Sequence, residues 1–166
     1  MKNRLMIADS EHNADMLYAT GMFVPDAFIA IEMDGHWHGL FSPLEVGRAK
    51  KESSLHEAHL DTTWRAAAEA AHYSGLAGIA AAFLKHHDIV QVEVPADFPL
   101  RYAEQLRGWG FEVRAAEAAF FSGRSVKSDH ELRCLAQSEA LTRRSMQQGE
   151  AYLAACGIGD DGILRD

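Results

Sequence analysis

Histidines are the residues of this sequence whose types and spacing point most directly to chemistry. The chain has 166 residues, and nine of them are histidine. His36 and His38 are separated by one residue; because alternate residues of a β-strand share a face, both imidazoles could reach one metal ion, as in H-x-H zinc sites. His56 and His59 are three residues apart, which suits a helix face. No cysteine or acidic cluster with ligand spacing completes either pair, so the pattern favours solvated surface histidines over a metal site.

A cysteine and a helix end are the other chemical candidates. Cys134 has basic neighbours, Arg133 and His130, which favour a thiolate, but an inert cysteine is the alternative that the rest of the sequence supports. His86 and His87 close a predicted helix, where positive charge complements the helix dipole, so a structural role is favoured over a catalytic one. The sequence has no Gly-x-Ser-x-Gly elbow, no Walker loop and no Gly-x-Gly-x-x-Gly opening a helix. We therefore assign no catalytic, cofactor-binding or metal-binding residue.

Composition and charge exclude several classes of function. The formal net charge is −8, and basic residues cluster only in pairs, Lys50-Lys51 and Arg143-Arg144, so a nucleic acid or an anionic membrane would be repelled. Hydrophobic residues make up 48%, enough for the core of one domain with an appendage. The longest apolar-rich stretch, Gly75–Leu84, is too short to span a bilayer, and the N-terminus is typical of a strand rather than a signal peptide. Cys134 and Cys156 are expected to be free thiols in the cytoplasm.

Strand and helix signals alternate along the chain. Asp34-Gly35 predicts a type I′ hairpin between strands at Ala27–Met33 and His36–Phe41, because such a turn needs positive φ. Other strands are predicted at Arg4–Ala8, Leu55–Leu60, Ile89–Val94 and Phe111–Arg114. Helices are predicted at Glu11–Tyr18 after an Asp9-Ser10 cap, from Ser42-Pro43 to Lys51, at Trp64–Tyr73 with Thr62 or Thr63 as cap, at Ala77–His87 and at Leu100–Arg107. This order predicts an α/β fold with a mixed β-sheet of five or six strands flanked by helices.

The stretch Gly123–Met146 carries the clearest helix start. Ser128 is predicted as the N-cap, and Glu131 can close a capping box. Gly149 is expected to end this helix. At about 100° per residue, one side of the helix is apolar and also includes Glu139. The apolar residues are Leu132, Leu135, Ala136, Ala140 and Met146.

Two motifs resemble one enzyme family. Arg124-x-x-Lys127-Ser128-x-x-Glu131 is similar to the entry of the helix that joins the two domains of the creatinase, prolidase and aminopeptidase P family. Tyr18-Ala19-Thr20-Gly21, followed by Pro25-Asp26-Ala27, resembles the Y-x-T-G-F and P-D-A segments of the family's N-terminal domain, although Met22-Phe23 stands where phenylalanine is usual. The resemblance implies a ribonuclease-H-like N-terminal domain at residues 1–124. Residues 125–166 would be the linker helix and the start of the catalytic pita-bread domain.

The resemblance also implies a function. The chain would be the non-catalytic N-terminal domain of a Xaa-Pro dipeptidase or aminopeptidase, inactive alone, which holds subunits together as a homodimer and narrows access to the active site. The family's catalysis uses two divalent metal ions, such as Mn, Co or Zn, held by two Asp, one His and two Glu. These ligands belong to the catalytic domain, so none is carried over onto residues of this chain, and creatinase shares the fold but works without metal.

Alternatives remain at this point. Many peptidase members carry a tryptophan near the end of the short helix after the hairpin, whereas this chain has Ala49-Lys50-Lys51-Glu52 there. The N-terminal domain of a creatinase-type amidinohydrolase is therefore open. A free-standing α/β domain that binds a ligand or partner is a second alternative, and an unrelated α/β domain is a third. The turn-rich ending GDDGILRD is expected to be a cut inside a longer chain.

Overall fold

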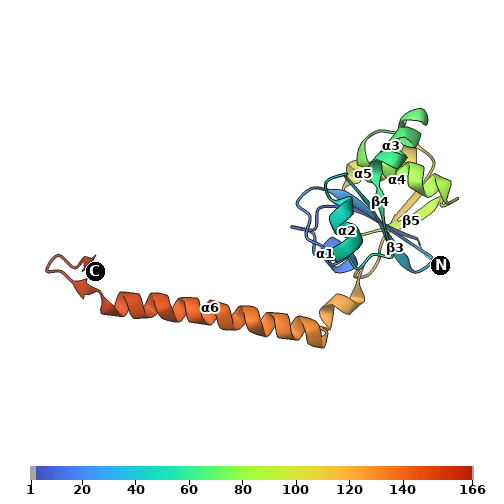
Figure 1. The fold of residues 1–166 in the computed structure, drawn as a ribbon. Coiled ribbons are helices and arrows are strands. Elements are labelled where there is room, and N and C mark those ends of the chain that lie inside the picture. Colours follow the sequence, from blue (N-terminus) through green and yellow to red (C-terminus); the bar gives the residue numbers. More distant parts are fainter. Residues whose placement is uncertain (1–2, 166) are drawn as a thin grey trace. The chain divides into compact units, whose positions relative to one another are not determined.

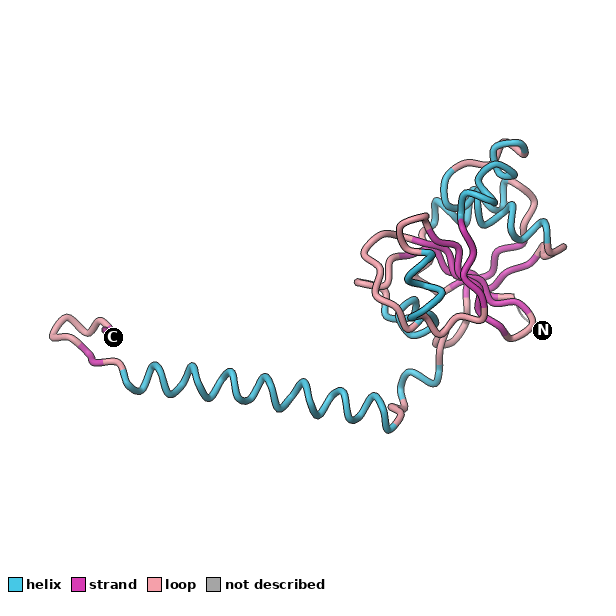
Figure 2. Tube along the Cα trace, in the orientation of Figure 1, coloured by secondary structure: helices cyan, strands magenta, loops and turns pink. Residues whose placement is uncertain are grey.

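The computed structural model describes residues 3–165, which fall into two compact units, Met1–Ser122 and Gly123–Asp166. The first unit is an α/β domain in which helices surround one mixed β-sheet (Figures 1 and 2). Its strands are β1 (Arg4–Ala8), β2 (Phe28–Met33), β3 (His36–Phe41), β4 (Glu57–Leu60), β5 (Gln91–Val94) and β6 (Glu112–Ala115). Its α-helices are α1 (Ala14–Thr20), α2 (Val46–Glu52), α3 (Asp61–Ala70), α4 (Gly75–His86) and α5 (Leu100–Gly108). The functions predicted for residues 1–124 and 125–166 stay predictions.

The sheet confirms the predicted fold class. Its strand order is β4-β3-β2-β1-β5-β6. The pairs β1–β2 and β2–β3 are antiparallel, whereas β3–β4, β1–β5 and β5–β6 are parallel. The hairpin between β2 and β3 turns at Asp34 and Gly35, with φ of 53° and 80°, the left-handed values that a type I′ turn requires. The first strand of the chain therefore lies in the middle of the sheet.

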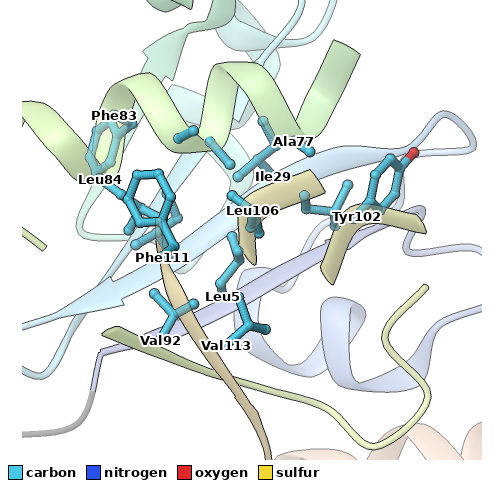
Figure 3. Close-up of a cluster of buried hydrophobic side chains, with 14 of the residues drawn as sticks. Leu5, Ile29, Ala77, Phe83, Leu84, Val92, Tyr102, Leu106, Phe111 and Val113 are labelled. Carbon is cyan, nitrogen blue, oxygen red and sulfur yellow. The ribbon is translucent and has the colours of Figure 1, made fainter. Parts of the chain in front are cut away.

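Two apolar clusters cover the two faces of the sheet. Leu5 and Ile7 of β1 belong to the cluster that includes α4 and α5, whereas Met6 belongs to the cluster that includes α1 and α2. This division follows from the alternation of side chains along a strand. Figure 3 shows the first cluster, in which Phe83 and Leu84 extend from α4 toward the strands. The sheet is thus buried on both faces, as its parallel pairs require.

Arg4 joins the beginning of the first unit to its end. Its guanidinium lies 5.1, 5.0 and 4.7 Å from the ring centroids of Trp37, Phe120 and Phe121. It donates a hydrogen bond of 2.7 Å to the carbonyl oxygen of Phe120 and pairs with the carboxylate of Glu32, its neighbour across β1 and β2. A planar guanidinium can make all these contacts at once, because its face stacks against the aromatic rings while the N–H groups along its edge donate hydrogen bonds.

Some predicted helix and strand ends were wrong, and the first helix shows why. The helix was predicted from Glu11 with Asp9-Ser10 as cap, but α1 begins at Ala14 and its N-cap is Asn13, whose side chain accepts from Met16 N at 2.9 Å. Ser10 cannot cap a helix there because its hydroxyl accepts from Val24 N at 2.7 Å. The strands predicted at Arg4–Ala8 and His36–Phe41 are confirmed with the same bounds, and the other predicted elements of the first unit are present with shifted ends.

The second unit consists of a long helix, α6 (Asp129–Ala155), and two short strands, β7 (Gly157–Ile158) and β8 (Leu164–Arg165). The predicted capping box is confirmed: Ser128 Oγ accepts from Glu131 N, and the Glu131 carboxylate accepts from Ser128 N. The prediction that Gly149 ends this helix was wrong, since one glycine costs only about 1 kcal/mol against alanine. None of the helices among residues 3–165 combines the length and the apolar character that crossing a membrane needs.

Candidate metal centre

Strand pairing brings histidines together at one edge of the sheet. β4 is the edge strand and runs parallel to β3, with His38 opposite Glu57 and Leu40 opposite His59. Because side chains alternate along a strand, Glu57 and His59 share the face of β4 that lies beside His38. The chain between the two strands contains α2, so residues that are distant in sequence become neighbours.

Three side chains converge closely enough to hold one metal ion. His38 Nδ1 and His59 Nε2 are 3.2 Å apart, and His59 Nε2 lies 3.7 Å from Glu57 Oε2. One ligand atom from each residue lies within 4.8 Å of the other two. His38 is buried, whereas the side chains of His59 and Glu57 are 20% and 60% exposed. The group therefore has a buried inner side and an outer side that is open to solvent.

The surroundings keep these imidazoles neutral. Burial lowers the pKa of His38, and the nearby rings of His59 and His56 lower it further. The pKa of His59 is also lowered, first by burial, although the carboxylate of Glu57 opposes the shift. Since neutral imidazole carries the lone pair that binds a metal ion, the electrostatics suit ligation.

The spacing along the sequence pairs these histidines differently. His36 and His38 are one residue apart and were considered as ligands of one ion, but the ring of His36 stacks on that of His56 with centroids 4.4 Å apart. His38 instead meets His59 and Glu57. Glu57 was missed altogether, because its role depends on the parallel register of β3 and β4 and no local spacing reveals that register. The assignment of no metal ligand stays a prediction.

Aromatic side chains from α3 and α4 form the wall behind the histidines. The ring centroid of Phe83 lies 5.4 Å from that of His59, and Trp64 packs against Phe83 at 4.9 Å. His86 and His87, predicted to close a helix, lie at the end of α4, where His87 contacts Phe83 and His86 contacts Trp64. Burial and the neighbouring His86 lower the pKa of His87.

Comparison with solved structures identifies the fold. The chain is similar to an X-Pro aminopeptidase from Thermotoga maritima MSB8, with a TM-score of 0.70 and 10% identity, over 89% of this chain and 40% of that one. It is also similar to the prolidase from Pyrococcus horikoshii OT3, with a TM-score of 0.54 and 16% identity, over 80% of this chain and 33% of that one. The fold is that of the prolidase N-terminal domain.

This prolidase-type fold is recognised from the structure, since no protein-family model and no curated protein matches the sequence. The prolidase from Pyrococcus furiosus gives a TM-score of 0.54 at 12% identity, over 80% of this chain and 34% of that one. The chain thus spans between a third and two fifths of the length of these proteins. Identities this low carry the fold and no residue roles.

A groove of about 840 Å³ lies at the opposite edge of the prolidase-type sheet, beside β5, β6 and residues 116–120. Its arginines are occupied within the domain. Arg107 donates to Glu104 and to the carbonyl oxygen of Val113, and Arg114 pairs with Glu112. Both arginines of the groove thus already have carboxylate partners within the domain.

The cysteines lie outside the prolidase-type domain, and both are free. In α6, Cys134 Sγ lies 3.7 Å from Nε2 of His130, one turn earlier. Cys134 is exposed on this helix. A general base one turn away is not enough for a nucleophile, because no third group orients the histidine through a contact that the structure describes.

Proposed function

We propose that this chain is the non-catalytic N-terminal domain of a Xaa-Pro peptidase-like hydrolase, followed by the helix that leads into the catalytic domain. The match to the Thermotoga X-Pro aminopeptidase carries the proposal, because it covers 89% of this chain and only 40% of that protein. It also extends beyond the domain, since 89% of 166 residues exceeds the 122 residues of the first unit. Part of the second unit therefore has a counterpart in the same protein.

The proposed roles of the domain are to associate subunits and to restrict access to the active site, in a cytoplasmic homodimer. Chemistry would belong to the rest of the polypeptide, where two divalent ions, such as Mn, Co or Zn, would activate water. The residues that the structure describes do not offer the two Asp, one His and two Glu that such a pair needs. Their candidate metal group is two histidines and one glutamate. The chain by itself should be inactive.

The first experiment is to read the open reading frame downstream of Asp166 and to express its full length. We expect a second domain with two Asp, one His and two Glu, and hydrolysis of Xaa-Pro dipeptides by the full-length protein in the presence of Mn²⁺, Co²⁺ or Zn²⁺. The 166-residue chain, assayed in parallel, should show no hydrolysis. A reading frame without that second domain would refute the peptidase proposal and leave a free-standing binding domain. Hydrolysis of creatine without metal would favour the amidinohydrolase instead.

Association is tested separately by sedimentation equilibrium on the 166-residue chain. We expect a reversible dimer with a mass near twice the 18.3 kDa of one chain. A monomer at the highest soluble concentration would rule out this domain as the site of association, without affecting the peptidase assignment.

A further inference from the structure

Backbone geometry, rather than side-chain flexibility, brings His38, Glu57 and His59 together. β3 and β4 pair in parallel, and the register places His38 beside Glu57 and Leu40 beside His59. His38 is 6% exposed and is held by neighbouring rings, including Phe83 at 6.2 Å between centroids. The inner ligand of the group is therefore fixed in place before any ion binds.

The distances fit a small, tetrahedral ion. Zinc–nitrogen bonds of about 2.0–2.1 Å at tetrahedral angles place two ligand nitrogens about 3.3–3.4 Å apart. His38 Nδ1 and His59 Nε2 are already 3.2 Å apart. Glu57 Oε2 lies 3.7 Å from His59 Nε2, and its side chain is 60% exposed. One ligand atom of Glu57 thus lies within 4.8 Å of a ligand atom of each histidine, close enough to be the third ligand of one ion.

A plain hydrogen bond between the two imidazoles accounts for only part of this geometry. A neutral imidazole carries one N–H, so in the 3.2 Å contact one of the atoms His38 Nδ1 and His59 Nε2 donates and the other accepts. This contact leaves out Glu57 Oε2, which lies 3.7 Å from His59 Nε2, beyond hydrogen-bond distance.

We propose that His38, Glu57 and His59 bind one divalent transition-metal ion, with Zn²⁺ as the first candidate. Two imidazoles and one carboxylate are the ligands of three-residue zinc sites, in which a fourth position stays open to water or another ligand. Mg²⁺ and Ca²⁺ prefer all-oxygen sites and do not fit the two imidazoles. The ion would join edge strand β4 to β3. The site is independent of the two-ion centre expected in the rest of the polypeptide.

The test uses the whole 166-residue chain after treatment with a chelator. Titration with Zn²⁺ by calorimetry should give one ion per chain, and Co²⁺ should produce the visible absorption of a tetrahedral or five-coordinate centre. His59→Gln and Glu57→Gln should each weaken binding by about tenfold or more, since even an outer-shell partner commonly contributes 10–100-fold. Glu57 is largely exposed and His59 is half-buried, so these variants should fold, which circular dichroism verifies.

Two control variants separate the site from other histidines. His12→Gln removes an exposed histidine that pairs with Asp9, and His36→Gln removes the ring that stacks on His56. Both should bind Zn²⁺ as the unchanged chain does. The proposal is overturned if the unchanged chain takes up no ion, or if His59→Gln and Glu57→Gln leave binding unchanged while His36→Gln abolishes it. None of these outcomes depends on peptidase activity, so the proposed function stands or falls separately.

Discussion

At the residue scale, Arg4 connects several segments of the first unit that are distant in sequence. Its guanidinium contacts the rings of Trp37, Phe120 and Phe121 and bonds to the backbone of residue 120. Glu32, its ion-pair partner, has a side chain that is only 16% exposed. Removal of the arginine would therefore leave a largely buried carboxylate without its cation, in addition to the lost ring contacts.

Arg4→Ala should lower the free energy of unfolding by about 2–3 kcal/mol, from the lost cation–π contacts and the lost charged hydrogen bonds. Arg4→Lys should recover part of this loss, because a lysine keeps the charge but not the planar donor edge. Urea denaturation followed by tryptophan fluorescence measures both. Arg114→Ala is the matched control: its pair with Glu112 is exposed, so the change should stay within about 0.5 kcal/mol. Equal losses for Arg4→Ala and Arg114→Ala would contradict this account.

At the scale of elements, two helical glycines have opposite roles. Gly78 in α4 faces the preceding turn, and a Cβ built there would lie 2.7 Å from the backbone carbonyl carbon of Tyr73. Gly149 in α6 has nothing within 4 Å of such a Cβ. Close packing of α4 thus requires the absence of a side chain at residue 78, whereas α6 has no such requirement at residue 149.

Gly78→Ala should destabilise the first unit by about 1–3 kcal/mol, because the contact is with backbone that cannot rotate away. Gly149→Ala should increase the helicity of α6, since alanine is favoured over glycine by about 0.5–1 kcal/mol inside a helix. Thermal unfolding measures the first change and far-ultraviolet circular dichroism the second. An increase in the melting temperature of Gly78→Ala would show that helix propensity outweighs packing at this position.

The elements also show what the sequence could predict. The capping box at Ser128 and Glu131 and the turn at Asp34-Gly35 depend on residues a few positions apart, so local patterns revealed both. Convergence of His38 with Glu57 and His59 depends on which strands pair and in which register. Strand pairing and register are determined by the tertiary structure as a whole, so they cannot be predicted from the spacing of residues along the chain.

At the scale of the whole molecule, the two units differ in how they are stabilised. Every buried side chain among the described residues lies between Leu5 and Val113. The described residues of the second unit are exposed or half-buried, and none is fully buried. Helix α6 nevertheless presents large apolar side chains to solvent, including Leu132, Leu135 and Met146.

A chain that ends at Ser122 should therefore unfold at the same urea concentration as the 166-residue chain. Its free energy of unfolding should differ from that of the longer chain by no more than about 0.5 kcal/mol. The truncated chain keeps all of the buried core and the contacts of Arg4 with Phe120 and Phe121. Urea denaturation of the two chains under the same conditions measures this difference. A lower urea midpoint for the truncated chain would mean that residues 123–166 stabilise the domain.

The central place of β1 has a consequence for synthesis on the ribosome. β1 pairs with β2 on one side, and both strands emerge early, but its other neighbour is β5. Gln91 follows Met33 by 58 positions, so at about 5–20 residues per second roughly 3–12 s pass before β5 can pair. During that interval the edge of β1 that will pair with β5 is unpaired, and the apolar face of the early strands is still uncovered. We expect this protein to depend on chaperones that shield such surfaces while the chain is still being made.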